Sequence, residues 1–427
     1  MNIAIIGLGY VGLPLCLQFA RRGVRVLGLD IDAKKVSALN AGRSYIKHIP
    51  AGEIKKLVRA GKFSATTDFA KIKEAEAILI CVPTPLKKNR APDLSFVLNT
   101  GKSIAPHLER GQIVVLESTT YPGTTENELR AVLEKSSGLK AGEDFHLAFS
   151  PEREDPGNPR SLGDIPKVIG GYTPACLEAA KKIYSRAIRT LVPVANCRTA
   201  EAAKLLENVF RGVNIALVNE LKGVYAAMDI DIWDVIAAAR TKPFGFMPFF
   251  PGPGLGGHCI PIDPFYLAWK ARQVGQETRF VELTGEINRA MPEKVVARLA
   301  KALASQKKSL RGVKVLVLGL AYKVNVDDDR ESPSYVLMDL LKARGAKVSY
   351  YDPHIPVIKL TREHPHWAGT KSVKWDRKTL AAFDAMLIAT AHDAVDYRQL
   401  AAWAPLIMDT RNVMAPLRCA PGQVWKA

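Results

Sequence analysis

The first thirty residues carry the feature that most restricts how this chain can fold. An apolar run of strand type leads into Gly7, Gly9 and Gly12 in a G-x-G-x-x-G pattern, and apolar residues at helical spacing follow. Strand, glycine turn and helix in this order are typical of a dinucleotide-binding unit. The glycines permit a tight turn and let a pyrophosphate approach the unpaired N–H groups at the helix N-terminus. We therefore predict a dinucleotide site formed by Gly7, Gly9, Tyr10, Val11 and Gly12.

Asp30 predicts the kind of dinucleotide. It ends a second apolar run, 18 residues after Gly12, where a carboxylate can accept hydrogen bonds from the ribose hydroxyls of a cofactor. A 2′-phosphate in the same place would be repelled by the carboxylate. The sequence therefore favours NAD over NADP.

The same apolar segment raises the alternative of a membrane span. Residues 3–20 are uncharged and about long enough to cross a bilayer. Three glycines and Pro14 argue against one continuous helix, and no positive residue precedes the run as in a signal peptide. We expect no membrane association. Six cysteines without C-x-x-C pairs fit a reducing cytoplasm and predict no metal site.

Length and charge bound the class of protein. With 427 residues, of which 48% are hydrophobic, about two to four domains are expected. The net charge of +18 points first to nucleic acid, but Lys and Arg are spread along the chain and no nucleic-acid motif is present. We expect no nucleic-acid partner. The charge fits either attraction of small anionic ligands or a solvated basic surface.

Buried-strand patterns alternate with helical patterns through the first part of the chain. The strand runs cover residues 77–82, 112–117, 146–149 and 167–170, and the first three end in polar or proline-containing loops. Loops at the carboxyl ends of parallel strands line the ligand crevice of a doubly wound sheet. The pattern predicts an NAD-binding Rossmann-like domain over residues 1–195.

A long helix follows this domain. Residues 199–228 show a helical pattern without proline, and its apolar face could pair with a second subunit. Lys204 and Asn208 are four residues apart and share one helical face. A cation and an amide presented together can hold an oxyanion, although such spacing is also common on solvated helix faces.

A second strand-turn-helix pattern begins at residue 313. The fold class that we predict is therefore α/β, with two Rossmann-like doubly wound domains joined by a central helical region. The expected domains are residues 1–195, a central helical domain at 196–305, and a C-terminal domain at 306–427.

The loop from residue 251 to 264, with the sequence P-G-P-G-L-G-G-H-C-I-P-I-D-P, places one thiol directly after a backbone with few side chains. Glycines allow a ligand to approach the main chain closely. Cys259 with Asp263 four residues later suggests a nucleophile with a proton-handling neighbour. The alternative is a structural turn that carries an inert buried cysteine.

Taken together, these motifs resemble the UDP-glucose/GDP-mannose dehydrogenase family. The motifs are those at residues 7–12, 82–85, 118–123, 150–153, Lys204 with Asn208, 254–259, and 322–333. They occur in the family's order over essentially the whole chain. Residues 150–157 and 244–253, with His258 before the cysteine, are most similar to the branch that oxidises UDP-N-acetylglucosamine at C6.

The resemblance implies a four-electron oxidation of a sugar CH2OH to a carboxylate with two NAD and one water. It implies that Cys259 captures the aldehyde as a thiohemiacetal, which a second hydride transfer converts to a thioester. Lys204 and Asn208 would stabilise charge on oxygen, and Asp263 would position the water and take part in proton transfer. Glu152 and Thr119 match family positions near the water and the nicotinamide.

The resemblance also implies which residues bind the ligands. Besides the glycine turn and Asp30, the expected cofactor contacts are Lys35, Thr84, Thr119 and Arg330. The expected contacts to the UDP-sugar substrate are Glu152, Arg153, Lys204, Asn208, Arg240, Phe249, Phe250, Gly256 and Lys323. A homodimer or a higher homo-oligomer is expected as well.

Two departures from the UDP-glucose enzymes concern the sugar. Those enzymes commonly carry P-E-F-L-R-E-G where this chain has P-E-R-E-D-P-G, so their second glutamate falls on Pro156. If that second glutamate acts as a base in those enzymes, then Glu152, Glu154 or a water held by a lysine would take this role here. Ile262 also stands where those enzymes often have lysine. Both changes favour a UDP-N-acetylhexosamine over UDP-glucose as the substrate. UDP-N-acetylglucosamine is the preferred candidate, and its galactosamine and mannosamine epimers are the alternatives.

Two other classes are weighed against this one. A two-electron hydroxyacid dehydrogenase would have no use for Cys259. A non-catalytic nucleotide-binding protein would not need Lys204, Asn208, Cys259 and Asp263 together.

Overall fold

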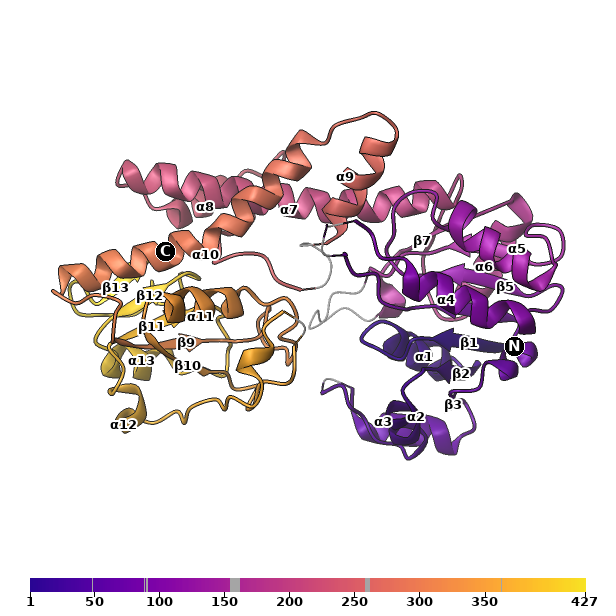
Figure 1. The fold of residues 1–427 in the computed structure, drawn as a ribbon, viewed down its shortest axis with the longest axis horizontal. Coiled ribbons are helices and arrows are strands. Elements are labelled where there is room, and N and C mark those ends of the chain that lie inside the picture. Colours follow the sequence, from indigo (N-terminus) through magenta and orange to yellow (C-terminus); the bar gives the residue numbers. More distant parts are fainter. Residues whose placement is uncertain (48, 88, 90, 154–161, 258–261, 362) are drawn as a thin grey trace. The chain divides into compact units, whose positions relative to one another are not determined.

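The computed structural model describes residues 1–427 except 48, 88, 90, 154–161, 258–261 and 362 (Figure 1). The chain forms two compact units. The first comprises residues 1–207 with 265–277, and the second comprises residues 208–264 with 278–427.

The first unit is built on a sheet with the strand order β3-β2-β1-β4-β5-β6-β7-β8. From β3 to β6 all neighbouring strands are parallel, and this order is that of a dinucleotide-binding fold. The strands are β1 Asn2–Ile6, β2 Arg25–Leu29, β3 Phe63–Thr66, β4 Ala77–Ile80, β5 Ile113–Leu116, β6 His146–Phe149, β7 Lys167–Gly171 and β8 Leu191–Val194.

Both faces of this sheet are covered, which explains the continuous apolar runs in its sequence. Ile3 and Ile5 of β1 belong to the core on one face, and Ala4 and Ile6 belong to the core on the other. Successive strand residues point to opposite faces, so a strand buried on both sides is apolar at nearly every position. The covering helices are α1 Gly12–Arg21, α2 Ala33–Asn40, α3 Ala51–Arg59, α4 Ser95–Ile104, α5 Arg130–Ser137 and α6 Pro174–Tyr184.

Strand β7 departs from the parallel arrangement that the sequence predicts. It pairs antiparallel with β6, with Phe149 opposite Gly170, and β8 is parallel to β7. Because β6 ends at Phe149, the residues before Gly170 extend past the carboxyl end of β6. Lys167, the first residue of β7, therefore lies at the carboxyl edge of the sheet, where a parallel strand would have its last residue.

The long helix predicted near residues 199–228 is confirmed as α7, Cys197–Ala227. The boundary between the two units falls within this helix, after Glu207. Three further helices complete the helical region, namely α8 Ile232–Ala239, α9 Asp263–Gln273 and α10 Arg279–Ser305. Across the described part of the chain, none of the helices combines the length and the apolar character that a bilayer crossing requires.

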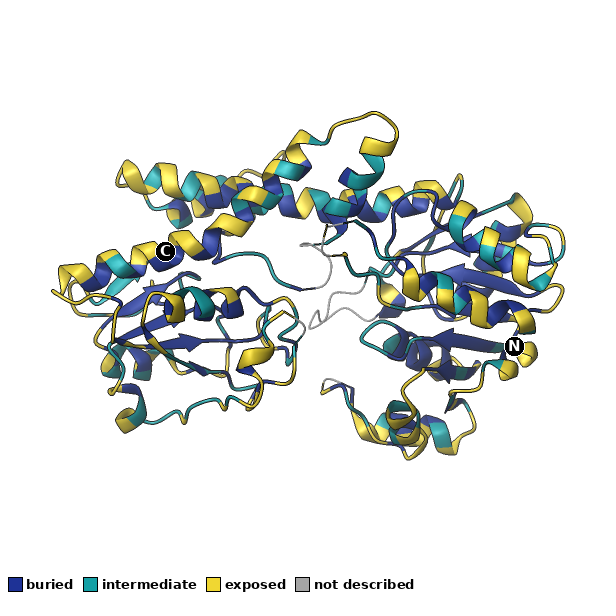
Figure 2. Cartoon of the chain, viewed as in Figure 1, coloured by how far each residue is buried: buried dark blue, intermediate teal, exposed yellow. Residues whose placement is uncertain are grey.

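The second unit contains a parallel sheet with the strand order β10-β9-β11-β12-β13. Alternate residues of β9 again enter two cores, with Val315 and Val317 in one and Leu316 and Leu318 in the other. Figure 2 shows the central strands of both sheets as buried and their covering helices with exposed outer faces. The elements are β9 Lys314–Leu318, α11 Pro333–Ala343, β10 Lys347–Tyr351, α12 Arg377–Leu380, β11 Ala385–Ile388, α13 Tyr397–Trp403, β12 Ile407–Asp409 and β13 Val424–Lys426. The predicted fold class, two Rossmann-like sheets with a helical region between them in sequence, is confirmed.

Candidate active site

The glycine turn after β1 has the geometry of a dinucleotide cradle. A Cβ atom at Gly7 would overlap the carbonyl oxygen of Cys81, and one at Gly12 would overlap the carbonyl oxygen of Gly7. Gly9, in contrast, has no atom within 4 Å of the place where its Cβ would lie. Two glycines are thus required by the backbone itself, and the third leaves open space before α1 where a pyrophosphate fits. Tyr10 and Val11, which complete the turn, are half-buried.

Asp30 lies at the end of β2 and holds this turn. Its Oδ2 accepts a hydrogen bond of 2.9 Å from the backbone N–H of Leu8, and its Oδ1 accepts one of 3.0 Å from Asp32. The Nζ of Lys35 lies 3.5 Å from the same Oδ2 and over the ring of Tyr45. Asp30 and Lys35, both predicted at the cofactor, are therefore brought together beside the glycine turn.

The second sheet repeats this arrangement with a different outcome. Gly319 follows β9 with a positive φ of 85°, and the Asp352 carboxylate accepts from the backbone N–H groups of Leu320, Ala321, His354 and Ile355. Burial would raise the pKa of Asp352, but these hydrogen bonds and His392 outweigh it and lower the pKa. Each Asp352 oxygen thus accepts from two backbone N–H groups, and the residue is only 2% exposed.

A buried charge cluster lies at the carboxyl edge of the first sheet, and the sequence analysis did not identify it. Lys167 Nζ donates to Glu117 Oε2 at 2.6 Å, to the Pro151 carbonyl at 3.4 Å and to Glu152 Oε2 at 3.4 Å. The hydroxyl of Tyr184 donates to the other oxygen of Glu117. A lysine at the head of a fully buried strand is the signal that could have revealed this cluster, because a buried cation requires a partner.

The pKa values in this cluster follow from burial and charge. Burial raises the pKa of Glu117, against the opposing effect of Lys167. Burial would lower the pKa of Lys167, but Glu117 and Glu152 outweigh it and raise the pKa. Burial also raises the pKa of Cys81, which follows β4 beside the cluster.

The predicted residues near the cluster lie on loops after β4, β5 and β6. Glu152 is 12% exposed and accepts a hydrogen bond from the backbone N–H of Arg153. The Arg153 guanidinium lies 2.8 Å from Glu207 and donates to the Pro166 carbonyl. Thr119 and Thr84 are both half-buried.

Helix α7 presents two buried charged side chains to the first unit. The Glu201 carboxylate accepts hydrogen bonds from the backbone N–H groups of Gly123 and Thr125 and from the Thr125 hydroxyl. Burial raises the pKa of Glu201 to about 7, although these hydrogen bonds act in the opposite direction. Lys204, predicted to be catalytic, lies three residues further along α7 and is 8% exposed. Glu201 was not predicted, but its spacing from Lys204 on one helical face is a signal that could have identified it.

In the second unit, α7 holds the end of the cysteine loop. The Asn208 amide donates a hydrogen bond of 2.5 Å to Asp263 Oδ2, and both side chains are 3% exposed. Asp263 is the first residue of α9. Cys259 itself lies outside the described residues, as do His258, Glu154 and Pro156. The structure therefore brings together two of the predicted catalytic residues, one on the helix and one four residues after the cysteine.

A second amide of α7 holds the start of the same loop. Asn219 accepts a hydrogen bond of 2.9 Å from the backbone N–H of Gly252 and donates one of 2.9 Å to Asn288 of α10. A Cβ at Gly252 would lie 2.6 Å from the guanidinium of Arg411, whose pKa burial lowers to about 10. Asn219, Asn288 and Arg411 were not predicted, and no motif in the sequence singles them out.

The glycines of the loop lie against the C-terminal sheet domain. A Cβ at Gly256 would lie 2.8 Å from both Tyr322 and Pro333, and one at Gly257 would lie 2.8 Å from the Tyr322 ring. Gly256, predicted at the substrate, thus has no room for a side chain. Lys323, which follows Tyr322, is half-buried.

The remaining predicted residues of the second unit are two phenylalanines that pack against α7 and α8, and two arginines. Phe249 packs edge-on against Phe210 of α7, and Phe250 stacks on Trp233 of α8, with ring centroids 5.6 and 5.5 Å apart. Arg240 follows α8 and is exposed. Arg330, predicted at the cofactor, forms two side-chain hydrogen bonds to Asp328, at 2.8 and 2.6 Å.

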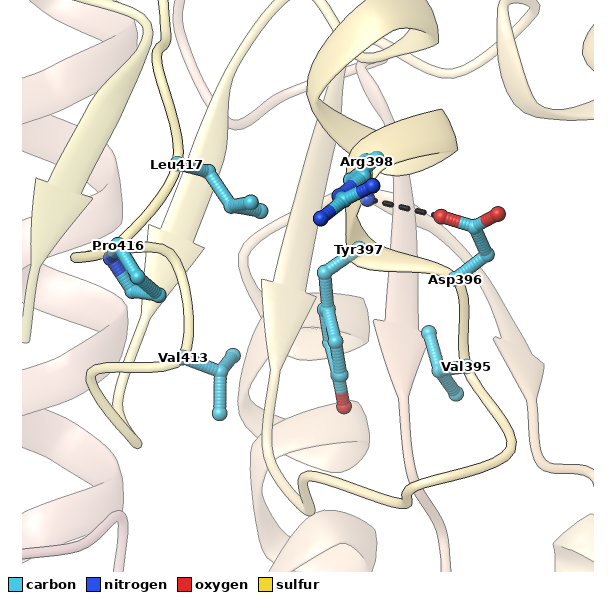
Figure 3. A pocket seen from close by; sticks show the side chains of 7 residues that line it. All are labelled: Val395, Asp396, Tyr397, Arg398, Val413, Pro416 and Leu417. Atoms are coloured by element: carbon cyan, nitrogen blue, oxygen red, sulfur yellow. Dashed lines mark hydrogen bonds between the residues drawn. The ribbon is translucent and has the colours of Figure 1, made fainter.

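A separate cavity of about 440 Å3 lies beside α13 (Figure 3). It is lined by Val395, Asp396, Tyr397, Arg398, Val413, Pro416 and Leu417. Asp396 caps α13 by accepting from the N–H groups of Arg398 and Gln399. The cavity contains none of the predicted site residues.

An open glycine turn, an acidic residue at the end of the second strand and a carboxylate cluster at the carboxyl edge place this protein among the dinucleotide-dependent α/β oxidoreductases. Sequence profiles of the UDP-glucose/GDP-mannose dehydrogenase family match it at residues 1–188 for the NAD binding domain, 198–290 for the central domain and 316–416 for the UDP binding domain. The chain belongs to this family. It is an NAD-dependent nucleotide-sugar dehydrogenase.

Characterised relatives are similar to the chain over most of their lengths. It is 35% identical to a UDP-N-acetyl-D-glucosamine 6-dehydrogenase of Pseudomonas aeruginosa, over 92% of this chain and 90% of that protein. It is 36% identical to a UDP-N-acetyl-D-mannosamine dehydrogenase of Salmonella typhi, over 92% and 94%. The solved structure of a UDP-D-ManNAc dehydrogenase from Pyrococcus horikoshii superposes with a TM-score of 0.88 at 31% identity, covering 100% of this chain and 99% of that one.

Asp30 gives the first prediction. Wild-type enzyme should have a much higher kcat/KM with NAD than with NADP, because the carboxylate repels a 2′-phosphate. Asp30→Ala should narrow the gap, mainly by weakening NAD. Steady-state kinetics with both cofactors measure this. Asp144→Ala serves as the control, because Asp144 precedes β6 and lies at the amino ends of the strands, opposite the carboxyl edge. Comparable wild-type values for the two cofactors would contradict the prediction.

Glu201 gives a prediction on stability and pH. Its pKa is about 7 in the folded protein and 4.5 ordinarily, so the folded state binds the proton more tightly. The contribution of this group to stability is fully present below pH 4.5 and is lost as the pH rises through 7, by about 3 kcal/mol in total. Glu201→Gln removes this ionisation but changes one hydrogen bond at every pH.

The measurement is the free energy of unfolding by urea, at intervals from pH 5 to pH 8. The wild-type value minus the Glu201→Gln value should decrease from pH 5 to about pH 7 and level off above it. Glu178→Gln removes an exposed carboxylate paired with Lys181 and should give a nearly constant difference. A constant difference for Glu201→Gln as well would show that the pKa of Glu201 is not raised.

Proposed function

We propose that this enzyme oxidises the C6 hydroxymethyl group of a UDP-N-acetylhexosamine to the carboxylate. The preferred substrate that we propose is UDP-N-acetylglucosamine. The observation that carries the proposal is the buried hydrogen bond between Asn208 and Asp263. It fixes the end of the Cys259 loop to the helix that presents Lys204. A two-electron dehydrogenase would have no use for Cys259, and a non-catalytic binding protein would not need Lys204, Asn208, Cys259 and Asp263 together.

The chemistry requires the loop because the reaction has two oxidation steps. NAD, when bound at the glycine turn, accepts a hydride in each step. Cys259 would attack the aldehyde carbon after the first transfer, and the resulting thiohemiacetal would lose the second hydride to become a thioester. Water would then displace the thiolate and release the carboxylate. Covalent capture keeps the aldehyde in place while the spent cofactor is exchanged.

The remaining roles follow the same proposal. Lys204 and Asn208 stabilise negative charge on the substrate oxygen. Asp263 positions the water and accepts a proton, and Glu152 and Thr119 act beside the water and the nicotinamide. The other UDP-sugar contacts proposed are Arg153, Arg240, Phe249, Phe250, Gly256 and Lys323, and Arg330 is proposed to reach the cofactor. Apart from Lys204 and Asn208 within α7, each of these groups lies on a loop or a helix end, as ligand contacts of such folds commonly do.

Two kinds of support favour an N-acetylated sugar. Pro156 and Ile262 depart from the pattern of UDP-glucose enzymes. The relatives named above act on N-acetylglucosamine or N-acetylmannosamine, and a third, 34% identical over 98% of the chain, is an NDP-N-acetyl-D-galactosaminuronic acid dehydrogenase of Ralstonia nicotianae. An acetamido group is the feature common to all three sugars.

We also propose that the enzyme is a homodimer or a larger homo-oligomer in the cytoplasm. Phe210, Leu217 and Val224 of α7 are 44 to 49% exposed and lie seven residues apart, on one face of the helix. Phe280 and Leu283 of α10 are exposed as well. Exposed apolar rows of this kind commonly mark protein interfaces. The three-part division at residues 195 and 305 belongs to the proposal too, since the three family profiles lie within those ranges.

The substrate is tested with a panel of UDP-sugars. We expect UDP-N-acetylglucosamine to have the highest kcat/KM, above its galactosamine and mannosamine epimers, UDP-glucose and GDP-mannose. NADH formation measured by absorbance gives each value. If UDP-glucose were oxidised about tenfold more efficiently than every N-acetylated sugar, a difference of about 1.4 kcal/mol, the assignment would be wrong.

The covalent step is tested at Cys259. Wild-type enzyme should yield two NADH per sugar with little free aldehyde, whereas Cys259→Ala should lose the complete reaction and retain at most the first oxidation. Cys259→Ser should accumulate a sugar ester that intact-protein mass spectrometry detects, because an oxygen ester hydrolyses more slowly than a thioester. Cys419→Ser changes a half-buried thiol elsewhere in the chain, so it is the control and should behave as wild type. Two NADH per sugar at wild-type rate from Cys259→Ala would refute the mechanism.

A further inference from the structure

The ammonium group of Lys167 is enclosed by acceptors on loops that follow two different strands. Its three contacts are Glu117 after β5 and the Pro151 carbonyl and Glu152 after β6. An ammonium group has three N–H donors, so these contacts use its full capacity. Lys167 is 5% exposed and Glu117 is fully buried. The lysine therefore links a buried anion to the loop that carries Glu152.

The geometry makes Glu152 the more accessible of the two carboxylates. Glu117 is held from both sides, by Lys167 and by the hydroxyl of Tyr184. Glu152 is 12% exposed and has a longer contact to the same lysine, at 3.4 Å. In a poorly solvated region, the cation of Lys167 favours the ionised form of Glu152 and an anion at Glu117 opposes it.

Other groups near Glu152 have their own partners. The Arg153 side chain pairs with Glu207 of α7, at 2.8 Å. Cys81, after β4, is held as a neutral thiol because burial raises its pKa. Tyr184, on α6, is likewise kept neutral by burial and by Glu117. Lys167 lies between Glu117 and Glu152, so its cation contacts both carboxylates.

We propose that Lys167 is a positioning residue of the oxidation, which holds the Glu152 carboxylate at the sheet edge as an anion ready to accept a hydrogen bond from the hydrolytic water. The inference rests on the proposed function, which places Glu152 beside that water. Neither the family resemblance nor the sequence pattern assigned a role to Lys167. The antiparallel direction of β7 brings it to this edge.

The experiment uses two substitutions that act in opposite directions. Lys167→Met removes the cation that favours the ionised form of Glu152, so Glu152 should hold its proton to higher pH, by about one pH unit. Glu117→Gln removes the repulsion and leaves the cation, so Glu152 should lose its proton at lower pH. Lys181→Met removes an exposed lysine paired with Glu178 and should change neither.

Two readouts are needed. Carboxyl 13C NMR of glutamate-labelled protein follows the titration of Glu152, whose signal Glu152→Gln identifies. The acid limb of the pH profile of kcat, with UDP-N-acetylglucosamine and NAD, should move in the same direction as the NMR midpoint in each variant. Lys167→Arg keeps the charge and should restore the wild-type limb. If Lys167→Met does not fold, Glu117→Gln and Lys167→Arg still test the proposal.

The outcomes separate this proposal from the proposed function. An unchanged Glu152 midpoint in both substitutions, or shifts in the same direction, would make Lys167 merely structural. Opposite NMR shifts in a protein that oxidises none of the UDP-sugars would reject the proposed function and leave the coupling of Lys167 to Glu152 standing. Opposite NMR shifts in an active enzyme whose acid limb stays in place would overturn the positioning role.

Discussion

A row of buried polar side chains on α7 determines much of what surrounds the site. Glu201, Lys204, Asn208 and Asn219 are separated by three, four and eleven residues, which keeps them near one face of the helix. A polar group removed from water is costly unless it is hydrogen-bonded. Glu201 meets this requirement with a loop of the first unit, and Asn208 and Asn219 meet it with the two ends of the cysteine loop in the second. These loops are therefore each attached to a different position of α7.

Two carboxylates at equivalent places show how one fold serves two purposes. Asp30 and Asp352 each end the second strand of their sheet and each accept from the backbone of a glycine turn. Asp30 uses one such bond to the turn and lies beside Lys35, whereas Asp352 is surrounded by backbone donors and His392. The first arrangement leaves the turn open for a cofactor, and the second turns the same residue into part of the core.

The sequence predicts those features that local chemistry controls. β1 is recognisable because alternate residues are buried in two cores, and the glycine turn because backbone overlap excludes any side chain at Gly7 and Gly12. Asn208 and Asp263 were each identified from a local motif, but their hydrogen bond was not predicted. The direction of β7 has no such local signature, since a short buried strand has the same residue pattern in a parallel and in an antiparallel pair. The partners of Lys167 and Asn219 depend on contacts between distant segments, so they emerge only with the tertiary structure.

The amides of Asn219 and Asn288 also select one alignment of α7 with α10. Asn288 donates to the Gly212 carbonyl as well as accepting from Asn219, so the two helices are joined at two points within their buried contact. Sliding one helix by a single residue would break both of these hydrogen bonds, at a cost of about 1–3 kcal/mol for each buried group left unsatisfied. Apolar side chains alone would tolerate several alignments of the two helices, but the hydrogen bonds of Asn219 and Asn288 favour a single one.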